Sequence, residues 1–227
     1  MCGRFTLRSP AHVLMAQFGL SALPPLNPRY NIAPTQPVLT VRTTIAGDHR
    51  EAMMAHWGLV PSWAQDPSIG QRMINARQET ISEKPSFRSA FRRRRCLVLA
   101  DGYYEWQKTG TRKQPFHIHQ ADEQPFAFAG LWESWSGSAT SADDLPWLSC
   151  TIVTTAASPA LSPIHDRMPV IVPPSAYRTW LDSEQQDAAT IAATMATWDV
   201  SEWCCDPVDT YVNRPQHDDP RCLQPAE

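Results

Sequence analysis

The most distinctive chemistry in the sequence lies at its start, where Met1 is followed by Cys2. Once Met1 is removed, Cys2 carries an α-amine and a thiol on adjacent carbons, which no internal cysteine does. The amine has an ordinary pKa of about 7.7, so near physiological pH it can condense with an aldehyde to an imine. The thiolate can then close a five-membered thiazolidine ring. Cysteine is small enough for Met1 to be removed readily, although the Met-Cys pair alone favours an inert second residue.

The other cysteines indicate neither a zinc site nor a disulfide framework, because they form no CxxC pair and have no regular spacing. Cys96 and Cys150 lie in apolar runs and are expected to be small buried residues. His117 and His119 alternate onto one strand face, but no cysteine pair or carboxylate motif completes a metal site beside them. We therefore expect these histidines to pack within a sheet, and we expect the protein to use neither a metal nor another cofactor.

Six sequence motifs, the first of which contains Cys2, combine polar residues with apolar or aromatic neighbours. They are MCGRF at 1–5, YNIAPTQ at 30–36, WGLVPSWA at 57–64, INARQET at 74–80, CLVLADGYYEW at 96–106 and IHDRMPVIV at 164–172. Together and in this order, they resemble the SRAP family, the SOS response-associated peptidases or abasic site processing proteins. The resemblance covers roughly the first three quarters of the chain and is weaker from about Ser183. It implies a single α+β domain whose processed terminal cysteine crosslinks to the ring-opened sugar of an abasic site in single-stranded DNA.

The resemblance also implies roles for three further residues. Asn75 in INAR would hold the terminal amine and the sugar, Glu105 in GYYEW would act as acid or base, and His165 in IHDRMP would move a proton at the opened sugar. Each has an ordinary alternative: a loop-bracing asparagine, a solvated carboxylate on a strand, and a surface or core histidine. A partly desolvated Glu105 would instead have a raised pKa that suits proton transfer.

Three arginines within these segments, Arg4, Arg77 and Arg167, are the expected contacts to the DNA backbone, because guanidinium groups match the geometry of phosphate oxygens. Structural ion pairing is their main alternative. The run Arg92–Arg95 is the strongest basic feature and a secondary DNA candidate. Because it lies at an expected helix end before a buried strand, a solvated or carboxylate-paired face is the alternative.

Tryptophans in the same segments offer faces on which bases can stack, although most of the nine tryptophans are expected in the core. Trp57, Trp63 and Trp106 are the candidates, and Trp63 is the expected DNA contact.

The elements that must position these residues predict an α+β fold built on a mostly antiparallel sheet. The resemblance to the SRAP family implies that this sheet is curved, contains a barrel and is surrounded by helices. Ser9 is expected to cap a first helix that has Pro10 at its first position and ends at Gly19, with Val13, Leu14 and Phe18 facing the core. Strands are expected at 2–7, 38–42, 96–100, 103–107, 115–119, 126–132, 148–156 and 168–172. Further helices are expected near 87–94, 177–181 and 187–198.

Composition bounds the class of protein. Residues 1–227 read as one continuous domain, with a less certain C-terminal tail from about 214 in which Asp218 and Asp219 are expected to be solvated. A net charge of −3 argues against a protein that coats duplex DNA, but it leaves room for a local basic groove. No apolar run approaches a membrane span, and the first residues lack the apolar core of a signal peptide, so we expect a cytoplasmic protein that associates with the nucleoid when it binds DNA. We also expect a monomer.

Two other functions compete with abasic-site capture. In the first, a thiol-dependent peptidase or amidohydrolase, Cys2 attacks a carbonyl with His165 as base, and self-removal of Met1 would be one such reaction. In the second, a non-catalytic single-stranded DNA module would keep the arginine groove and need no free terminus. A stable protein–DNA adduct distinguishes capture from both.

Overall fold

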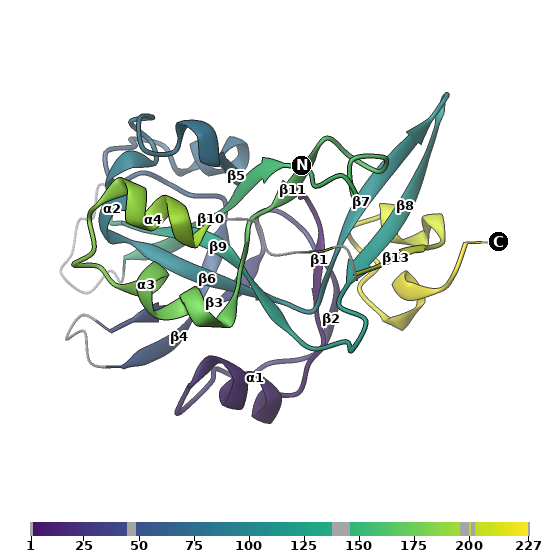
Figure 1. Cartoon of the computed structure of the whole chain (residues 1–227), viewed down its shortest axis with the longest axis horizontal. Helices are drawn as coiled ribbons and strands as arrows, with labels where there is room; N and C mark the ends of the chain where they lie inside the picture. The colour runs from purple at the N-terminus through teal and green to yellow at the C-terminus, as the bar shows by residue number, and fades with distance from the viewer. Residues whose placement is uncertain (1, 45–48, 138–145, 196–199, 201–202, 227) are drawn as a thin grey trace.

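The computed structural model of the chain describes residues 2–44, 49–137, 146–195, 200 and 203–226. Within these residues the strands form two sheets (Figure 1). The five-stranded sheet contains β1 (Phe5–Leu7), β2 (Arg29–Ile32), β7 (Gly102–Thr109), β8 (Arg112–His119) and β13 (Cys204–Pro207). The eight-stranded sheet contains β3 (Pro37–Thr43), β4 (Arg50–Trp57), β5 (Asn75–Arg77), β6 (Arg95–Ala100), β9 (Phe126–Trp135), β10 (Trp147–Ala156), β11 (Arg167–Pro169) and β12 (Ile171–Val172).

The larger sheet closes on itself into a five-stranded barrel. Antiparallel pairs join β4 to β3, β3 to β6, β6 to β9 and β9 to β10, and a parallel pair joins β10 back to β4. Closure leaves these strands without the unpaired edges of an open sheet. Further along its length, beyond its pairs with β4 and β9, β10 also pairs with β5 and β11. The prediction of an α+β fold with a barrel-containing, mostly antiparallel sheet is confirmed.

One core joins the barrel to the five-stranded sheet, whose order is β13-β8-β7-β1-β2. Phe5 on β1 packs edge-on against Trp57 of β4 and Phe128 of β9, with ring centroids 5.2 and 5.7 Å away. Tyr103 on β7 also contacts the Phe128 ring. Because apolar side chains from both sheets pack in the same core, the barrel fixes the position of the chain that begins at Cys2.

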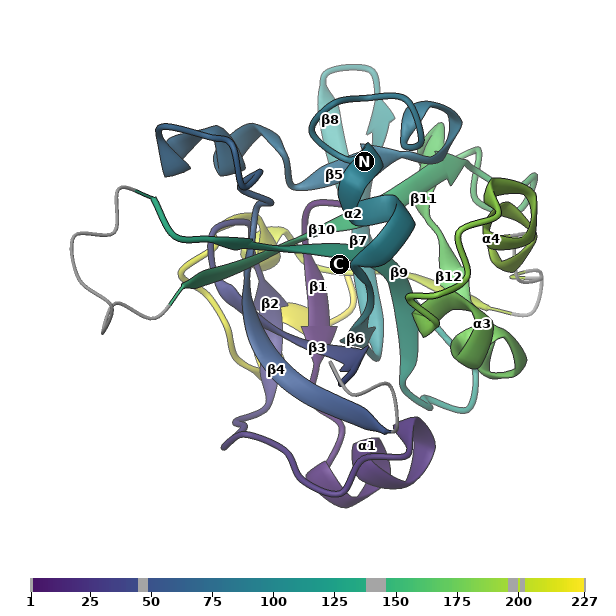
Figure 2. The same ribbon diagram turned by 90° about the vertical axis from the view of Figure 1, so that its left-hand side faces the viewer.

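Four α-helices lie outside the sheets in the described residues: α1 (Ala11–Phe18), α2 (Arg88–Arg93), α3 (Tyr177–Leu181) and α4 (Ala188–Thr194). The 3₁₀ helices are η1 (Pro67–Arg72), η2 (Gln78–Thr80), η3 (Pro174–Ala176), η4 (Thr210–Asn213) and η5 (Pro220–Leu223). Figure 2 shows α3 and α4 beside β9 and β12, and α1 beyond the far end of β4. No helix in the described part of the chain is long and apolar enough to cross a bilayer.

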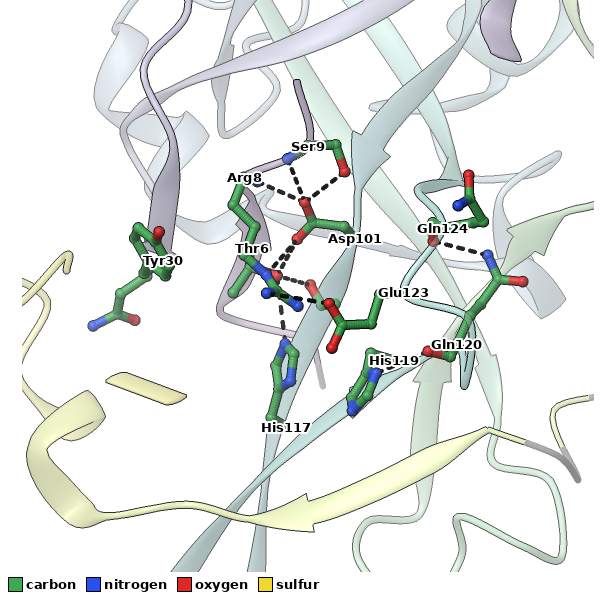
Figure 3. A network of polar contacts seen from close by, with 12 residues as sticks. Thr6, Arg8, Ser9, Tyr30, Asp101, His117, His119, Gln120, Glu123 and Gln124 are labelled. Carbon is green, nitrogen blue, oxygen red and sulfur yellow. Dashed lines mark hydrogen bonds and ion pairs between the residues drawn. The ribbon is translucent and has the colours of Figure 1, made fainter. Parts of the chain in front are cut away.

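The start of α1 differs from the predicted cap. Pro10 is the N-cap residue, and no side chain caps the helix; Gly19 ends it with φ 65°, as expected. The Ser9 hydroxyl instead donates to Asp101, which also accepts from the backbone N–H groups of Arg8 and Ser9 (Figure 3). Asp101 follows β6, so its carboxylate ties the end of β1 to the barrel. Leu14 and Phe18 are buried, whereas Val13 is only half-buried.

The predicted arginine run divides into residues with different environments, and the DNA role suggested for Arg95 is wrong. Arg95 is 3% exposed, and its guanidinium donates to five backbone carbonyls. The carbonyls belong to Phe91, Arg92, Trp180, Asp182 and Gln185. Arg94 pairs with Glu133, whereas Arg92 and Arg93 are exposed on α2. Arg95 therefore binds the chain itself, joining β6 to α2 and α3.

The acidic pair in the C-terminal segment is not a solvated patch. Asp218 accepts from the backbone N–H groups of Tyr30 and Asn31 and pairs with Arg29, which attaches the segment to β2. Asp219 caps η5 and accepts from the Tyr211 hydroxyl. In Figure 1 this yellow segment lies beside β8 and β13.

Several predicted boundaries also change. The first strand begins at Phe5 rather than Cys2, and the strand expected at 168–172 is interrupted at Val170 into β11 and β12. The helix Tyr177–Leu181 has the predicted bounds. The helix expected near 187–198 is seen at Ala188–Thr194, and residues 196–199 lie outside the described residues.

Candidate active site

Cys2 is fully buried in the central core, three residues before β1. The Asn75 side-chain amide donates to the Cys2 carbonyl oxygen over 2.8 Å. Asn75 begins β5, which is held parallel to β10 by the pair of Asn75 with Ile152. The Asn75 Oδ1 atom is buried and accepts no hydrogen bond within the described structure. Asn75 thus fixes the backbone of Cys2 and keeps one acceptor for another group.

Glu105 lies on β7 and is 3% exposed, so it is not the solvated carboxylate of the alternative interpretation. Burial raises the pKa of its carboxyl, and the nearby His165 partly opposes this rise. Burial also raises the pKa of the Cys2 thiol, and the neighbouring Glu105 adds to that effect. Both groups therefore favour their protonated forms more than their exposed counterparts do.

Tyr103 is a residue of the site that sequence reasoning missed. It is fully buried two positions before Glu105, so both side chains lie on the same face of β7. Burial raises the pKa of its hydroxyl, with further contributions from Cys2 and then Glu105. The hydroxyl has no hydrogen-bond partner within the described structure. The alternation that gave Glu105 its face would have identified Tyr103 as its neighbour.

His165 lies in the turn before β11, with its side chain 29% exposed. Its Nδ1 atom accepts from the backbone N–H of Arg167 over 2.9 Å and lies 2.9 Å from a carboxylate oxygen of Asp166. His165 is thus oriented by its own turn, and in its protonated form it lowers the pKa of Glu105.

The three predicted DNA arginines have unequal surroundings. Arg77 is exposed at the end of β5, and its guanidinium makes no hydrogen bond or ion pair within the described structure. Arg167 binds both carboxylate oxygens of Glu79 and the carbonyl of Thr154. Arg4 is half-buried and donates to acceptors on Asn31, Val212 and Asn213. The guanidinium groups of Arg4 and Arg167 thus already donate hydrogen bonds to acceptors within the protein.

The three candidate tryptophans also differ in burial and in hydrogen bonding. Trp57 is fully buried, and its indole N–H donates to the carbonyl of Ile74. Trp106 donates to Asn213 and lies beneath the guanidinium of Arg4. Trp63 is 58% exposed.

His117 and His119 occupy one face of the five-stranded sheet, with ring centroids 4.9 Å apart. Burial lowers the pKa of His117 to about 3, so its ring is neutral at physiological pH. It packs where Gly102 has no side chain, and its Nε2 lies 3.4 Å from the Thr6 hydroxyl (Figure 3). His119 pairs with Asp206. The described residues contain no group of His, Cys, Asp and Glu side chains arranged to hold a metal ion.

Comparison with known proteins identifies the relatives of this arrangement. Residues 1–215 match the family described as SOS response associated peptidase (SRAP). The chain is 37% identical to the abasic site processing protein YoqW of Bacillus subtilis, over 99% of both chains. It is 32% identical to the abasic site processing protein YedK of Escherichia coli, over the full length of both. A crystal structure of a Bacteroides thetaiotaomicron protein superposes with a TM-score of 0.87 at 25% identity, covering all of both chains. On sequence and fold together, the chain belongs to the SRAP family.

Proposed function

We propose that this protein processes abasic sites in single-stranded DNA, capturing them as a thiazolidine on Cys2 after Met1 has been removed. The observation that carries the proposal is the Asn75–Cys2 hydrogen bond, which holds Cys2 beside the buried carboxyl of Glu105. The relatives named as abasic site processing proteins support the same substrate. The sugar of an abasic site exists partly as an open aldehyde, which is the natural target of an amine and thiol on adjacent carbons.

The proposed reaction has two bond-forming steps. The Cys2 amine adds to the aldehyde carbon, and the resulting hydroxyl leaves as water to give an imine. The Cys2 sulfur then adds to the imine carbon, and the thiol proton ends on the nitrogen. An imine can also promote β-elimination of the adjacent phosphate, which cleaves the strand. Because ring closure consumes the imine, it protects the strand, and strand cleavage by elimination is the expected side activity.

The environment of Glu105 suits it to both proton transfers. Its raised pKa keeps a larger protonated fraction near neutral pH than an exposed glutamate has, so the carboxyl can donate to the departing hydroxyl. The carboxylate that remains can then accept the thiol proton. This transfer needs a base because the raised pKa of Cys2 keeps its thiol protonated. His165, oriented by the Arg167 N–H, would move the proton at the opened sugar.

The DNA strand is proposed to cross this site, and the protein is proposed to act as a monomer in the cytoplasm. Arg77 is the best-placed phosphate contact because its guanidinium is exposed and unengaged within the described residues. Contacts from Arg4 and Arg167 stay predictions, and each would have to share donors with protein acceptors. Exposed Trp63 offers an indole face for a base.

The peptidase alternative is proposed here as self-removal of Met1. The Cys2 sulfur would attack the Met1 carbonyl carbon, forming a thioester while the Cys2 nitrogen leaves as the new amine. Water would then cleave the thioester and release methionine. Full burial of Cys2 favours a carbonyl in its own chain over one in an external polypeptide.

The test uses protein whose intact mass shows that Met1 is absent. A single-stranded oligonucleotide with one abasic site should give an adduct that survives denaturation, and an intact oligonucleotide should not. Cys2→Ala should abolish the stable adduct while leaving some strand cleavage, because an alanine terminus still has an amine. Cys204→Ala, which removes a half-buried thiol elsewhere, is the matched control and should crosslink normally. Equal adduct yield from both oligonucleotides, or a stable adduct with Cys2→Ala, would exclude the proposal.

A further inference from the structure

Three large hydrophobic side chains are exposed in the described structure. They are Met54, Trp63 and Trp147, with 38%, 58% and 37% of their surface accessible. Met54 and Trp147 line the same hollow of about 550 Å³. Scattered apolar side chains are normal on soluble proteins, whereas a contiguous aromatic patch marks a binding surface.

Trp147 and Trp63 are mounted on one rigid scaffold. The Trp147 ring lies edge-on to the rings of His56 and Trp135, with centroids 4.7 and 6.1 Å away. The Trp135 indole N–H donates to the carbonyl of Ala64 over 2.7 Å, which holds the loop that carries Trp63. Figure 2 shows the neighbouring ends of β9 and β10, where Trp135 and Trp147 pair, reaching away from the barrel.

A second hollow, of about 350 Å³, shares Trp147 and His56 with the first and reaches η1. Both hollows are open to the surface rather than enclosed. Trp147 therefore stands between two spaces, either of which can receive a planar ring against the indole.

The charges around Trp147 favour stacking over ionic recognition. Burial lowers the pKa of His56, so its imidazole is neutral at physiological pH and adds aromatic surface without charge. The Asp66 carboxylate is engaged by the backbone N–H and hydroxyl of Ser68. Arg72 is exposed in the last turn of η1, next to Gln71, which lines the second hollow. Neutral aromatic faces bordered by one carboxylate and one arginine fit a nucleic-acid strand that is held by stacking of its bases.

Strand β10 connects this surface to Cys2. Five residues separate Trp147 from Ile152, which pairs with Asn75, the residue that holds Cys2. At about 3.3 Å per residue, Trp147 lies ~17 Å along the strand from that pair. A single strand with stacked bases rises about 3.4 Å per nucleotide, so this reach is ~5 nucleotides, and fewer if the strand is extended.

We infer that Trp147, supported by His56 and Trp135, is a base-stacking subsite for the single strand on one side of the abasic site, beyond Trp63. The inference rests on the proposed function and deepens it. It makes the DNA footprint one-sided: nucleotides a few positions from the abasic site add affinity on the Trp147 side alone.

The first test compares oligonucleotides that carry an uncleavable abasic analogue with either two or eight flanking nucleotides on each side. Removing one stacked base should weaken binding about tenfold. Trp147→Ala should therefore cost about tenfold with the long flanks and nothing with the short ones, and Trp147→Phe should recover part of the loss. The matched control is Trp132→Ala, because Trp132 is half-buried on the other face of β9. An equal loss on both lengths, or none, would overturn the inference.

A second test needs no variant. A photoreactive 5-iododeoxyuridine is placed at successive positions on either side of the abasic analogue, and the crosslinked peptides of the wild-type protein are identified by mass spectrometry. The peptide containing Trp147 should be labelled from one side only, within about five nucleotides. Labelling from neither side would refute the subsite. The proposed function is tested separately, with short oligonucleotides that carry a true abasic site. If the wild-type protein forms no Cys2 adduct on them, the proposed function is refuted, whatever the result at Trp147.

Discussion

At the scale of single residues, the site combines groups that are expensive to keep in a core. Glu105 is 3% exposed, the buried Tyr103 hydroxyl has no hydrogen-bond partner within the described structure, and the Asn75 Oδ1 atom lacks one as well. A buried polar atom without a partner costs about 1–3 kcal/mol. Such costs are typical of sites where a ligand supplies the missing partners. The abasic sugar, with its hydroxyl and aldehyde oxygens, has the groups to do so.

Replacing Glu105 should separate catalysis from binding. Glu105→Gln keeps the size of the side chain and removes its proton exchange, so the single-turnover crosslinking rate at saturating protein should fall by 10²-fold or more. Affinity for an uncleavable abasic analogue should change by less than about threefold, since a proton transfer acts on the barrier. His165→Ala should also slow crosslinking more than it weakens binding. A rate that falls only in proportion to affinity would contradict these roles.

Glu105→Gln should also change the free energy of unfolding by an amount that depends on pH. Because the pKa of Glu105 is raised in the folded state, its carboxyl stabilises the fold at low pH, and this contribution is lost as pH rises through the folded pKa. Glutamine has no such proton, so Glu105→Gln should become progressively more stable relative to wild type as pH rises from the ordinary glutamate pKa of about 4.3 through the raised folded pKa. Urea unfolding at several pH values measures the difference. A constant difference across that range would show that burial does not perturb this carboxyl.

At the scale of elements, β6 depends on Arg95, whose five carbonyl acceptors lie on α2, on α3 and in the chain beyond α3. Arg95→Ala leaves those carbonyls without their donor, so the free energy of unfolding should fall by about 3 kcal/mol or more. Arg77→Ala, at an exposed arginine, is the matched control. It should leave stability unchanged and lower the salt dependence of DNA binding by about one unit of slope. Unchanged urea unfolding for Arg95→Ala would contradict the structural role.

Local sequence was informative where an element's own residues decide its structure. Tyr177–Leu181 was predicted with its observed bounds, and β6 and β9 were found as apolar runs. The sequence REAMMAHW of β4 is rich in helix formers and was missed, because its pairing with β3 and β10 determines its conformation. Strands as short as β5 and β13 show no periodicity. Nor could the sequence tell which arginine of 92–95 turns inward, since that depends on acceptors some 85–90 residues away.

Prediction of the site had a similar limit. The motifs identified Cys2, Asn75, Glu105 and His165, and the structure brings the first three together around the core with His165 at the rim. They could not rank Arg4, Arg77 and Arg167, because the acceptors that engage two of them come from distant segments. Tyr103 was missed because a tyrosine beside a motif glutamate is ordinarily a packing residue.

At the scale of the whole molecule, the C-terminal segment completes the five-stranded sheet. Asp218→Asn keeps the shape but removes the charge that accepts two backbone N–H groups and pairs with Arg29, so stability should fall by about 1–3 kcal/mol. Asp122→Asn, at an exposed carboxylate in the turn after β8, is the control and should have little effect. Thermal unfolding followed by circular dichroism measures both. A silent Asp218→Asn would mean that the segment is held by its apolar contacts alone.

The position of β1 has a mechanical consequence. In the proposed adduct, tension on the DNA enters the protein at Cys2 and reaches β1 after two residues. Strand β1 lies between β2 and β7 and pairs with both, so a pull along its axis loads both ladders in shear at once. Phe5 would leave the centre of the core first, removing the contacts with Trp57 and Phe128 that join the sheet to the barrel. A motor protein that pulls on the DNA would therefore begin to unfold the protein at β1, the strand next to the crosslink. The rate of this unfolding would be set by the height of the unfolding barrier rather than by equilibrium stability.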